Sequence, residues 1–311
     1  MSVTVDRGGC VSCHRPLDDK GMAHGIEAMH PLVDGQPLTC VRCHGGDDTT
    51  LVLSQAHVAP SIDDPIDLRS LSHGELDTVT LPYLRFINPG DLRVADQACG
   101  DGCHDATVTA VKTSAMAIKS SSYASGRFRA GQQRSAQALK AVRDASNPRF
   151  AVGERYGTVG AVAKLDEPRI PGDEDQPGPY YDLFLTKDCG GCHLYRFADD
   201  QVAGSHRSSG CSACHVAYDA SGTSRSADPT INHQAKGHPA QHRMVTKPGN
   251  EQCTTCHQAG GARIGLSFQG LRQAASPGQE PAERVYDHSG RWGLGSSGLV
   301  SKEDRHNAYD A

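Results

Sequence analysis

Twelve cysteines form six close pairs in this 311-residue chain, and a histidine directly follows the second cysteine of every pair. Five pairs read CxxCH, and the third, CGDGCH, has one more residue between its cysteines. Two thiols at this spacing can add across the two vinyl groups of a haem, and the next histidine then ligates the iron from the proximal side. The pairs with their histidines are Cys10/Cys13/His14, Cys40/Cys43/His44, Cys99/Cys103/His104, Cys189/Cys192/His193, Cys211/Cys214/His215 and Cys253/Cys256/His257.

Three other kinds of site use paired cysteines, and the repeated histidine argues against each of them. Zinc ribbons and disulfides place no requirement on the residue after the second cysteine. Thioredoxin-like redox sites carry one such motif on a βαβ frame, which this sequence does not show. Because only 16 of the 311 residues are histidine, six chance placements have a probability on the order of 10⁻⁸. We therefore expect six covalently attached haems c.

The longer third motif requires a looser turn than the other five. Gly100 and Gly102 lie between its two cysteines, and glycine adopts backbone conformations that other residues avoid. We expect this permissive backbone to absorb the additional residue, so that His104 remains a proximal ligand.

Ten further histidines remain, and the opposite, distal faces of six haem irons need six of them at most. His30 lies shortly before the second motif, and His57 follows that motif in an apolar setting. His238 and His242 are four residues apart, so one helical turn could aim them at different haems. The distal candidates are His30, His57, His238, His242, His24 and His206, with His233 and His73 in reserve.

The rest of the composition provides little material for a conventional core. Only 37% of the residues are hydrophobic, and the aromatic residues are six Phe, nine Tyr and one Trp. Porphyrins would supply the missing apolar bulk, because a haem buries far more apolar surface than a phenylalanine does. No apolar run approaches the ~18 residues of a membrane span. The net charge of -5 argues against a nucleic-acid partner.

The motifs also predict how the chain is organised. Helical spacing predicts a helix over 106–119, residues 135–145 are a second helix candidate, and the prolines of 168–179 indicate a loop. We expect a mostly irregular fold with short α-helices and very little β, wrapped around a closely packed row of six haems. The expected regions are an N-terminal three-haem region (1–104), a haem-free helical and linker segment (105–188), a C-terminal three-haem region (189–288) and a Gly/Ser-rich tail (289–311).

Longer segments around the motifs resemble the multihaem c-type cytochromes of metal-reducing and sediment bacteria. The segments are IEAMHP and CVRCHGG within 26–46, RFINPGDLRVADQACGDGCH at 85–104, KDCGGCH at 187–193, RSSGCSACHVAY at 207–218, and GHPAQHRM with QCTTCHQAGGARIGLSF within 237–268. This resemblance implies periplasmic or extracellular electron transfer. By haem number alone, the chain is also similar to the hexahaem cytochromes that polymerise into extracellular filaments.

These observations favour an electron conduit without catalytic residues, in which electrons hop along crowded haems. The expected partners are other redox proteins or extracellular electron acceptors, together with further copies of the chain, up to a filament. We expect the protein at the cell surface or outside the cell, with the periplasm as second choice. Covalent haem attachment takes place outside the bacterial cytoplasm. Residues 1–9 lack the apolar core of a signal peptide, so we expect an export signal that is not in this sequence.

The alternative function is a multihaem reductase that acts on a small nitrogen or sulfur oxyanion. Such an enzyme leaves one haem iron with an open face for its substrate. No CxxCK motif, typical of nitrite-reducing enzymes of this kind, occurs in the sequence. The unusual third motif is therefore the first place to look for an open haem.

Overall fold

The computed structural model describes residues 8–14, 30, 38–60, 76–146, 161–166, 177–186, 192–198, 206–218, 221–226, 228, 230–239, 244–249 and 252. The α-helices in these ranges are α1 (Gly8–Cys13), α2 (Cys40–His44), α3 (Leu53–Ala56), α5 (Leu81–Ile87), α6 (Asp105–Lys112), α7 (Ala115–Ile118), α8 (Ser120–Arg129), α9 (Pro177–Phe184) and α10 (Ser212–His215). A π-helical segment, η2, spans Asp96–His104. The strands are β1 (Lys140–Ala141), β2 (Ala145–Ser146) and β3 (Ala161–Lys164).

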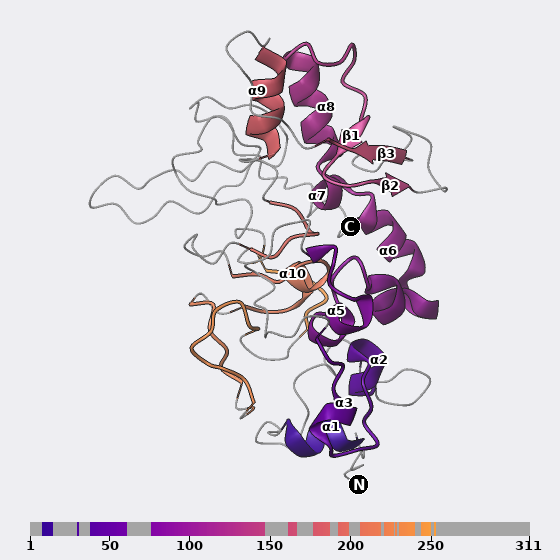
Figure 1. Ribbon diagram of the computed structural model, residues 1–311, viewed down its shortest axis with the longest axis vertical. Coiled ribbons are helices and arrows are strands. Elements are labelled where there is room, and N and C mark those ends of the chain that lie inside the picture. The colour runs from indigo at the N-terminus through magenta and orange to yellow at the C-terminus, as the bar shows by residue number, and fades with distance from the viewer. Residues whose placement is uncertain are drawn as a thin grey trace, which may run out of the picture.

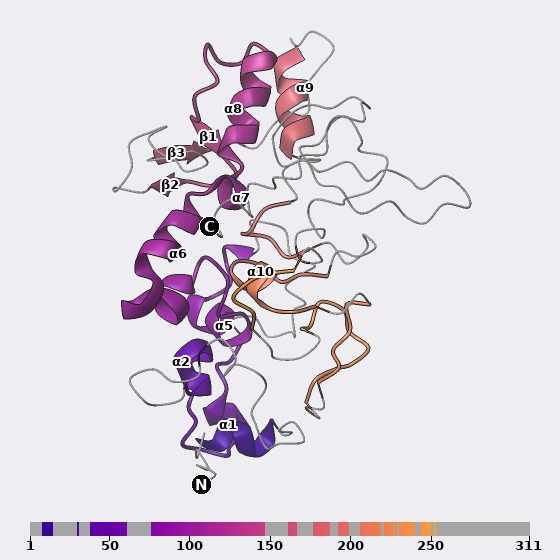
Figure 2. The same ribbon diagram turned by 180° about the vertical axis from the view of Figure 1, so that it is seen from behind.

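The described elements are arranged one after another along the longest axis of the molecule (Figure 1). The indigo elements α1, α3 and α2 lie at the N-terminal end, α5, α6 and α10 lie in the middle, and the sheet, α8 and α9 lie at the far end. The view from behind shows the same order (Figure 2). The first motif, on α1, therefore lies at one pole. Among the described residues, no helix combines the length and the apolar character needed to cross a membrane.

Three small groups of apolar side chains form the described core. The largest joins the third-motif region, α6, α7, the sheet and the segments around the fourth and fifth motifs. Cys99, Cys211 and Cys214 pack against its edge. Its buried members are Leu92, Ala95, Val108, Ala117, Ile118, Ala141, Val162, Leu194, Tyr195 and Ala213. This core therefore supports two of the cysteine motifs directly.

The sheet has the order β1-β3-β2, with β1 parallel and β2 antiparallel to β3. Ala141 is opposite Lys164, and Ala145 is opposite Val162. The helix predicted over 135–145 is therefore wrong, because this stretch contains β1 and the start of β2. Pairing with a strand some twenty residues later decided its conformation, and local periodicity does not register such a partner.

The helix predicted over 106–119 is confirmed as α6 and α7, with a break at Thr113 and Ser114. The Thr113 hydroxyl donates to the carbonyl of Thr109 at 3.2 Å, and the Ser114 side chain accepts the Ala117 N–H at the start of α7. Short hydroxyl side chains compete with helical hydrogen bonds and favour helix starts. They explain why one predicted helix became two.

Two features near the far end were not predicted. The loop expected over 168–179 is wrong at its end, because α9 begins at Pro177. Proline is tolerated in the first helical turn, where its missing N–H has no partner to lose. The serine-rich α8 gave no helical signal, yet Tyr123 is buried and Gly126 lies directly against Tyr181 of α9. Tertiary packing, rather than propensity, holds this helix.

Gly210→Ala should destabilise the protein by about 2–6 kcal/mol, because a strained backbone and an overpacked contact each cost about 1–3 kcal/mol. Gly210 has φ +65°, donates its N–H to the Leu194 carbonyl at 2.6 Å, and has no space for a Cβ beside the Gly90 carbonyl. Gly131→Ala is the matched control, since Gly131 has φ +71° but open space around it. Urea unfolding followed by circular dichroism measures both losses. Equal losses in the two variants would contradict the steric explanation.

Candidate functional site

Three of the CxxCH motifs form a single helical turn each. The His14 N–H donates to the Cys10 carbonyl at 2.9 Å, and the His215 N–H donates to the Cys211 carbonyl at the same distance. The second motif is the five-residue helix α2, which ends at His44. An i+4→i hydrogen bond of this kind brings the histidine back over the first cysteine. The thiols and the imidazole therefore lie on one short turn.

The third motif forms a wider turn within η2, Asp96–His104. The helical conformation is interrupted between the two cysteines, at Asp101 (φ 1°, ψ 72°) and at Gly102, so the motif contains a kink. Gly102 has φ +77°, a conformation that glycine adopts without a steric penalty. The expected looser turn is thus present, and it lies at Gly102.

Cysteines of successive motifs lie close to one another. Burial and, after it, the nearby Cys40 thiol raise the pKa of Cys10, and burial with Cys99 raises the pKa of Cys43. A hydrogen bond between the Cys99 and Cys211 thiols lowers the pKa of Cys99 and, together with burial, raises that of Cys211. The first, second, third and fifth motifs therefore form one continuous series.

The structure places two of the predicted haem thiols, Cys103 and Cys192, differently from this series. Cys103 of the third motif is exposed, and its thiol accepts a hydrogen bond from the guanidinium of Arg42. Hydrogen bonds to Asp101 and, after it, to Cys103 raise the pKa of Arg42. Cys192 of the fourth motif is half-buried and lies where the backbone bends, not on a helical turn. Haem attachment stays a prediction at these two thiols, as it does at the other ten.

None of the described cysteines forms a disulfide. They are Cys10, Cys13, Cys40, Cys43, Cys99, Cys103, Cys192, Cys211 and Cys214. A thiol that adds to a vinyl group must not be part of a disulfide, and these nine fit that chemistry.

Two arginines form hydrogen bonds between the second motif and its neighbours. Arg85 of α5 donates from Nε to the Cys43 carbonyl at 3.0 Å and from Nη2 to the Arg42 carbonyl at 2.7 Å, so it caps the end of α2. Arg42 bonds both the side chain and the carbonyl of Asp101 in the third motif, each at 2.8 Å. The spacing between these two motifs is thereby fixed through side chains as well as backbone.

Three motif histidines share one hydrogen-bonding pattern. Nδ1 of His44 lies 2.6 Å from the Phe86 carbonyl, Nδ1 of His215 lies 2.8 Å from the Val245 carbonyl, and Nδ1 of His14 lies 2.9 Å from a carboxylate oxygen. These oxygens only accept, so Nδ1 carries the proton and Nε2 carries the lone pair. Burial lowers the pKa of His44, which keeps its ring neutral. This is the tautomer that a haem-ligating histidine needs, so the three sites fit a haem iron.

The fourth motif differs in this respect. His193 is almost fully buried, and its Nδ1 lies 3.1 Å from the backbone N–H of Tyr195. Because that N–H can only donate, Nδ1 accepts and the ring proton is on Nε2. In this orientation His193 does not present Nε2 to an iron, and a ring flip would be needed for it to do so. Cys189, its first cysteine, lies outside the described residues.

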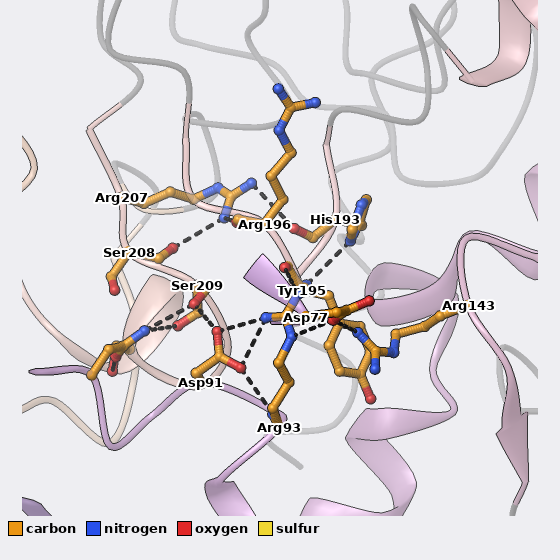
Figure 3. A network of polar contacts seen from close by, with 12 residues as sticks. Asp77, Asp91, Arg93, Arg143, His193, Tyr195, Arg196, Arg207, Ser208 and Ser209 are labelled. Carbon is orange, nitrogen blue, oxygen red and sulfur yellow. Dashed lines mark hydrogen bonds and ion pairs between the residues drawn. The ribbon is translucent and has the colours of Figure 1, made fainter. Parts of the chain in front are cut away.

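A buried polar network surrounds His193 and joins the middle of the chain to the fourth and fifth motifs (Figure 3). Arg93, at its centre, bonds Asp91 at 3.1 Å, Asp77 at 2.8 Å and the Tyr195 carbonyl at 3.0 Å. Burial by itself would lower the pKa of Arg93, but the carboxylates of Asp91 and Asp77 hold this pKa above its usual value. The Asp91 carboxylate accepts in turn from Ser209, just before Cys211. The network thus positions the segments on which both motifs are built.

Two motif histidines face a second histidine. The ring centroids of His14 and His57 are 6.0 Å apart, and those of His104 and His30 are 6.1 Å apart. Two imidazoles on opposite sides of one metal ion, each about 2 Å from it through nitrogen, have centroids roughly 6 Å apart. Nδ1 of His30 is buried and makes no hydrogen bond to any described residue. Burial and the neighbouring His104 lower the pKa of His30, which favours the neutral ring that a metal requires.

The pairing itself was not expected from the sequence. His30, close to the second motif in the chain, lies beside the third, and His57 lies beside the first. His206 is buried against the backbone of Gly222, and His238 is half-buried, so their proposed ligation stays a prediction. The predictions that fall outside the described residues are those for Cys189, Cys253, Cys256, His257, His24, His73 and His242.

Sequence reasoning missed the groups that orient the imidazoles. These are the carbonyls of Phe86 and Val245, and the side chains of Asp228 and Thr230 beside His14. Backbone carbonyls carry no sequence signal, and Asp228 is 214 residues from His14. In the part of the chain that the structure describes, no three His, Cys, Asp or Glu side chains are grouped to hold a bare metal ion.

Comparison with known protein families, with curated proteins and with solved structures gave no match. The function is therefore inferred from the chemistry of this chain's own residues.

Proposed function

We propose that this protein is a hexahaem c-type cytochrome that conducts electrons along a row of covalently bound, mostly bis-histidine haems. The pairing of motif histidines with second histidines carries the proposal: His14 with His57, and His104 with His30. A bound haem supplies one-electron exchange between ferric and ferrous iron. Histidines on both faces would occupy every coordination position, which suits electron transfer and disfavours substrate binding.

The contacts between motifs support conduction along a row. Thiols of the first and second, the second and third, and the third and fifth motifs lie within electrostatic range of one another. Haems attached through these cysteines would be neighbours, and short separations between neighbours are what electron hopping needs. The carbonyls and the carboxylate at Nδ1 would hold three of the proximal rings in position.

The alternative is a reductase with one open haem. The third motif was the first place to look for it, and there His30 lies across from His104. This placement favours a six-coordinate iron and hence the conduit. The spin state of the haems, measured in the experiment below, distinguishes the reductase from the conduit.

The proposal includes an exported protein, outside the cell or on its surface, that exchanges electrons with redox proteins, with extracellular acceptors or with copies of itself, up to a filament. The position of α1 at one pole supports end-to-end contact (Figure 1). Leu51, shortly before α3, and Leu53, the first residue of α3, are 69% and 71% exposed. Electron microscopy of concentrated, haem-loaded protein should show fibres, and a protein that stays monomeric would remove the filament from the proposal.

The test is to produce the chain with an export signal in a bacterium that attaches haem c. Intact mass and the pyridine haemochrome should give six haems per chain, and a variant with Cys40→Ala and Cys43→Ala should lose one of them. Electron paramagnetic resonance should show low-spin iron only. A high-spin haem in the wild type would favour the reductase, and a haem-free product would refute the cytochrome.

A further inference from the structure

One motif histidine has a charged partner, whereas the two with the same ring orientation have neutral ones. Nδ1 of His14 lies 2.9 Å from Oδ2 of Asp228. The corresponding nitrogens of His44 and His215 donate to the backbone carbonyls of Phe86 and Val245. The first site therefore differs electrostatically from the second and the fifth.

The Asp228 carboxylate is held in place for this contact. Its side chain is 9% exposed. Oδ1 accepts from the Thr230 N–H at 2.9 Å and from the Thr230 hydroxyl at 2.7 Å, which leaves Oδ2 for His14. The Thr230 oxygen also lies 3.0 Å from Nδ1 of His14, and the Asp228 N–H donates to Ser226 at 3.1 Å. Three residues of one loop thus hold the Asp228 carboxylate in place under the first motif.

A carboxylate attracts the Nδ1 proton more strongly than a carbonyl does. The imidazole consequently gains negative charge and donates more electron density through Nε2 to a bound iron. Added electron density stabilises ferric over ferrous iron and lowers the reduction potential. The burial of Asp228 strengthens this effect, because nearby water screens it less.

We propose that Asp228 gives the haem of the first motif a lower reduction potential than the haems of the second and fifth motifs. This inference rests on the proposed function. Under that function, a one-electron carrier of still lower potential would be oxidised at the N-terminal pole and the first haem reduced, so this pole would suit electron entry. The electron would then move on to the second-motif haem, with no bond formed or broken and no proton released. Asp228 is a positioning residue, because it acts through His14.

The experiment compares the haem-loaded wild type with Asp228→Asn by spectroelectrochemical titration and electron paramagnetic resonance. The amide keeps the shape and can still accept from Nδ1, but it removes the charge. One of the six midpoint potentials should rise, so that the ratio of reduced to oxidised haem at that site increases several-fold at the wild-type midpoint. The g values of one low-spin signal should change, and Asp228→Glu, which keeps the charge, should restore both properties toward the wild type.

Asp48→Asn is the matched control. The Asp48 carboxylate is close enough to raise the pKa of Cys10, and the Asp48 carbonyl accepts the Gly9 N–H, so it places a negative charge near the same motif without contacting His14. This variant should leave the g values unchanged. The inference is overturned if Asp228→Asn retains six haems with unaltered potentials, or if Asp48→Asn changes the g values equally. A wild type without haem would instead overturn the proposed function.

Discussion

His57→Ala should convert one low-spin haem of the loaded protein into a high-spin, five-coordinate haem. The ring centroid of His57 lies 6.0 Å from that of His14 and 5.1 Å from that of Phe86. Alanine offers no ligand and leaves an opening on that side of the iron. Electron paramagnetic resonance should show a new high-spin signal, and the ferrous protein should bind carbon monoxide at one haem per chain.

His30→Ala should produce the same change at a second haem, and the double variant should produce it at two. His233→Ala is the matched control, because His233 is an exposed histidine of the 230–239 turn and was only a reserve candidate. A His57→Ala protein that keeps six low-spin haems would contradict the pairing with His14. A His233→Ala protein with a high-spin haem would contradict the choice of distal ligands.

Arg93→Met should reduce the free energy of unfolding by about 3–5 kcal/mol, the usual cost of breaking a buried ion pair from one side. The Arg93 side chain is 5% exposed and that of Asp91 is fully buried. Methionine replaces the apolar volume but leaves the Asp91 carboxylate without its counter-charge. Since domains of this kind have about 5–15 kcal/mol of stability in total, the loss is a large fraction. Urea unfolding followed by circular dichroism measures this loss of stability.

Two variants isolate the cause of this loss. Lys140→Met breaks the pair of Lys140 with Asp166, whose side chain is 97% exposed, and should cost less than about 1 kcal/mol. Arg93→Lys keeps the charge but not the planar fork that reaches Asp91, Asp77 and the Tyr195 carbonyl together, so it should give an intermediate loss. If Arg93→Met were as stable as Lys140→Met, the network would not be what joins the middle of the chain to the fourth and fifth motifs.

The sequence was a good guide where a structure depends on neighbours in the chain. The looser turn of the third motif was predicted from two glycines, and Gly102 adopts the positive φ that this turn requires. The helix over 106–119 was predicted from apolar spacing and is present, apart from its break. The sequence was a poor guide at 135–145, where β3 supplies the partner. The wrapping of the chain around a row of haems remains a prediction.

The sequence by itself determined the chemistry that this chain can do, because two thiols and an imidazole act together within five or six consecutive residues. It therefore predicted the proximal histidines and a set of candidates for the distal ligands. Only the tertiary structure decided that His57 faces His14, that His30 faces His104 and that Asp228 lies under His14. These contacts join residues far apart in the chain, and the folding of the intervening segments decides which of them meet.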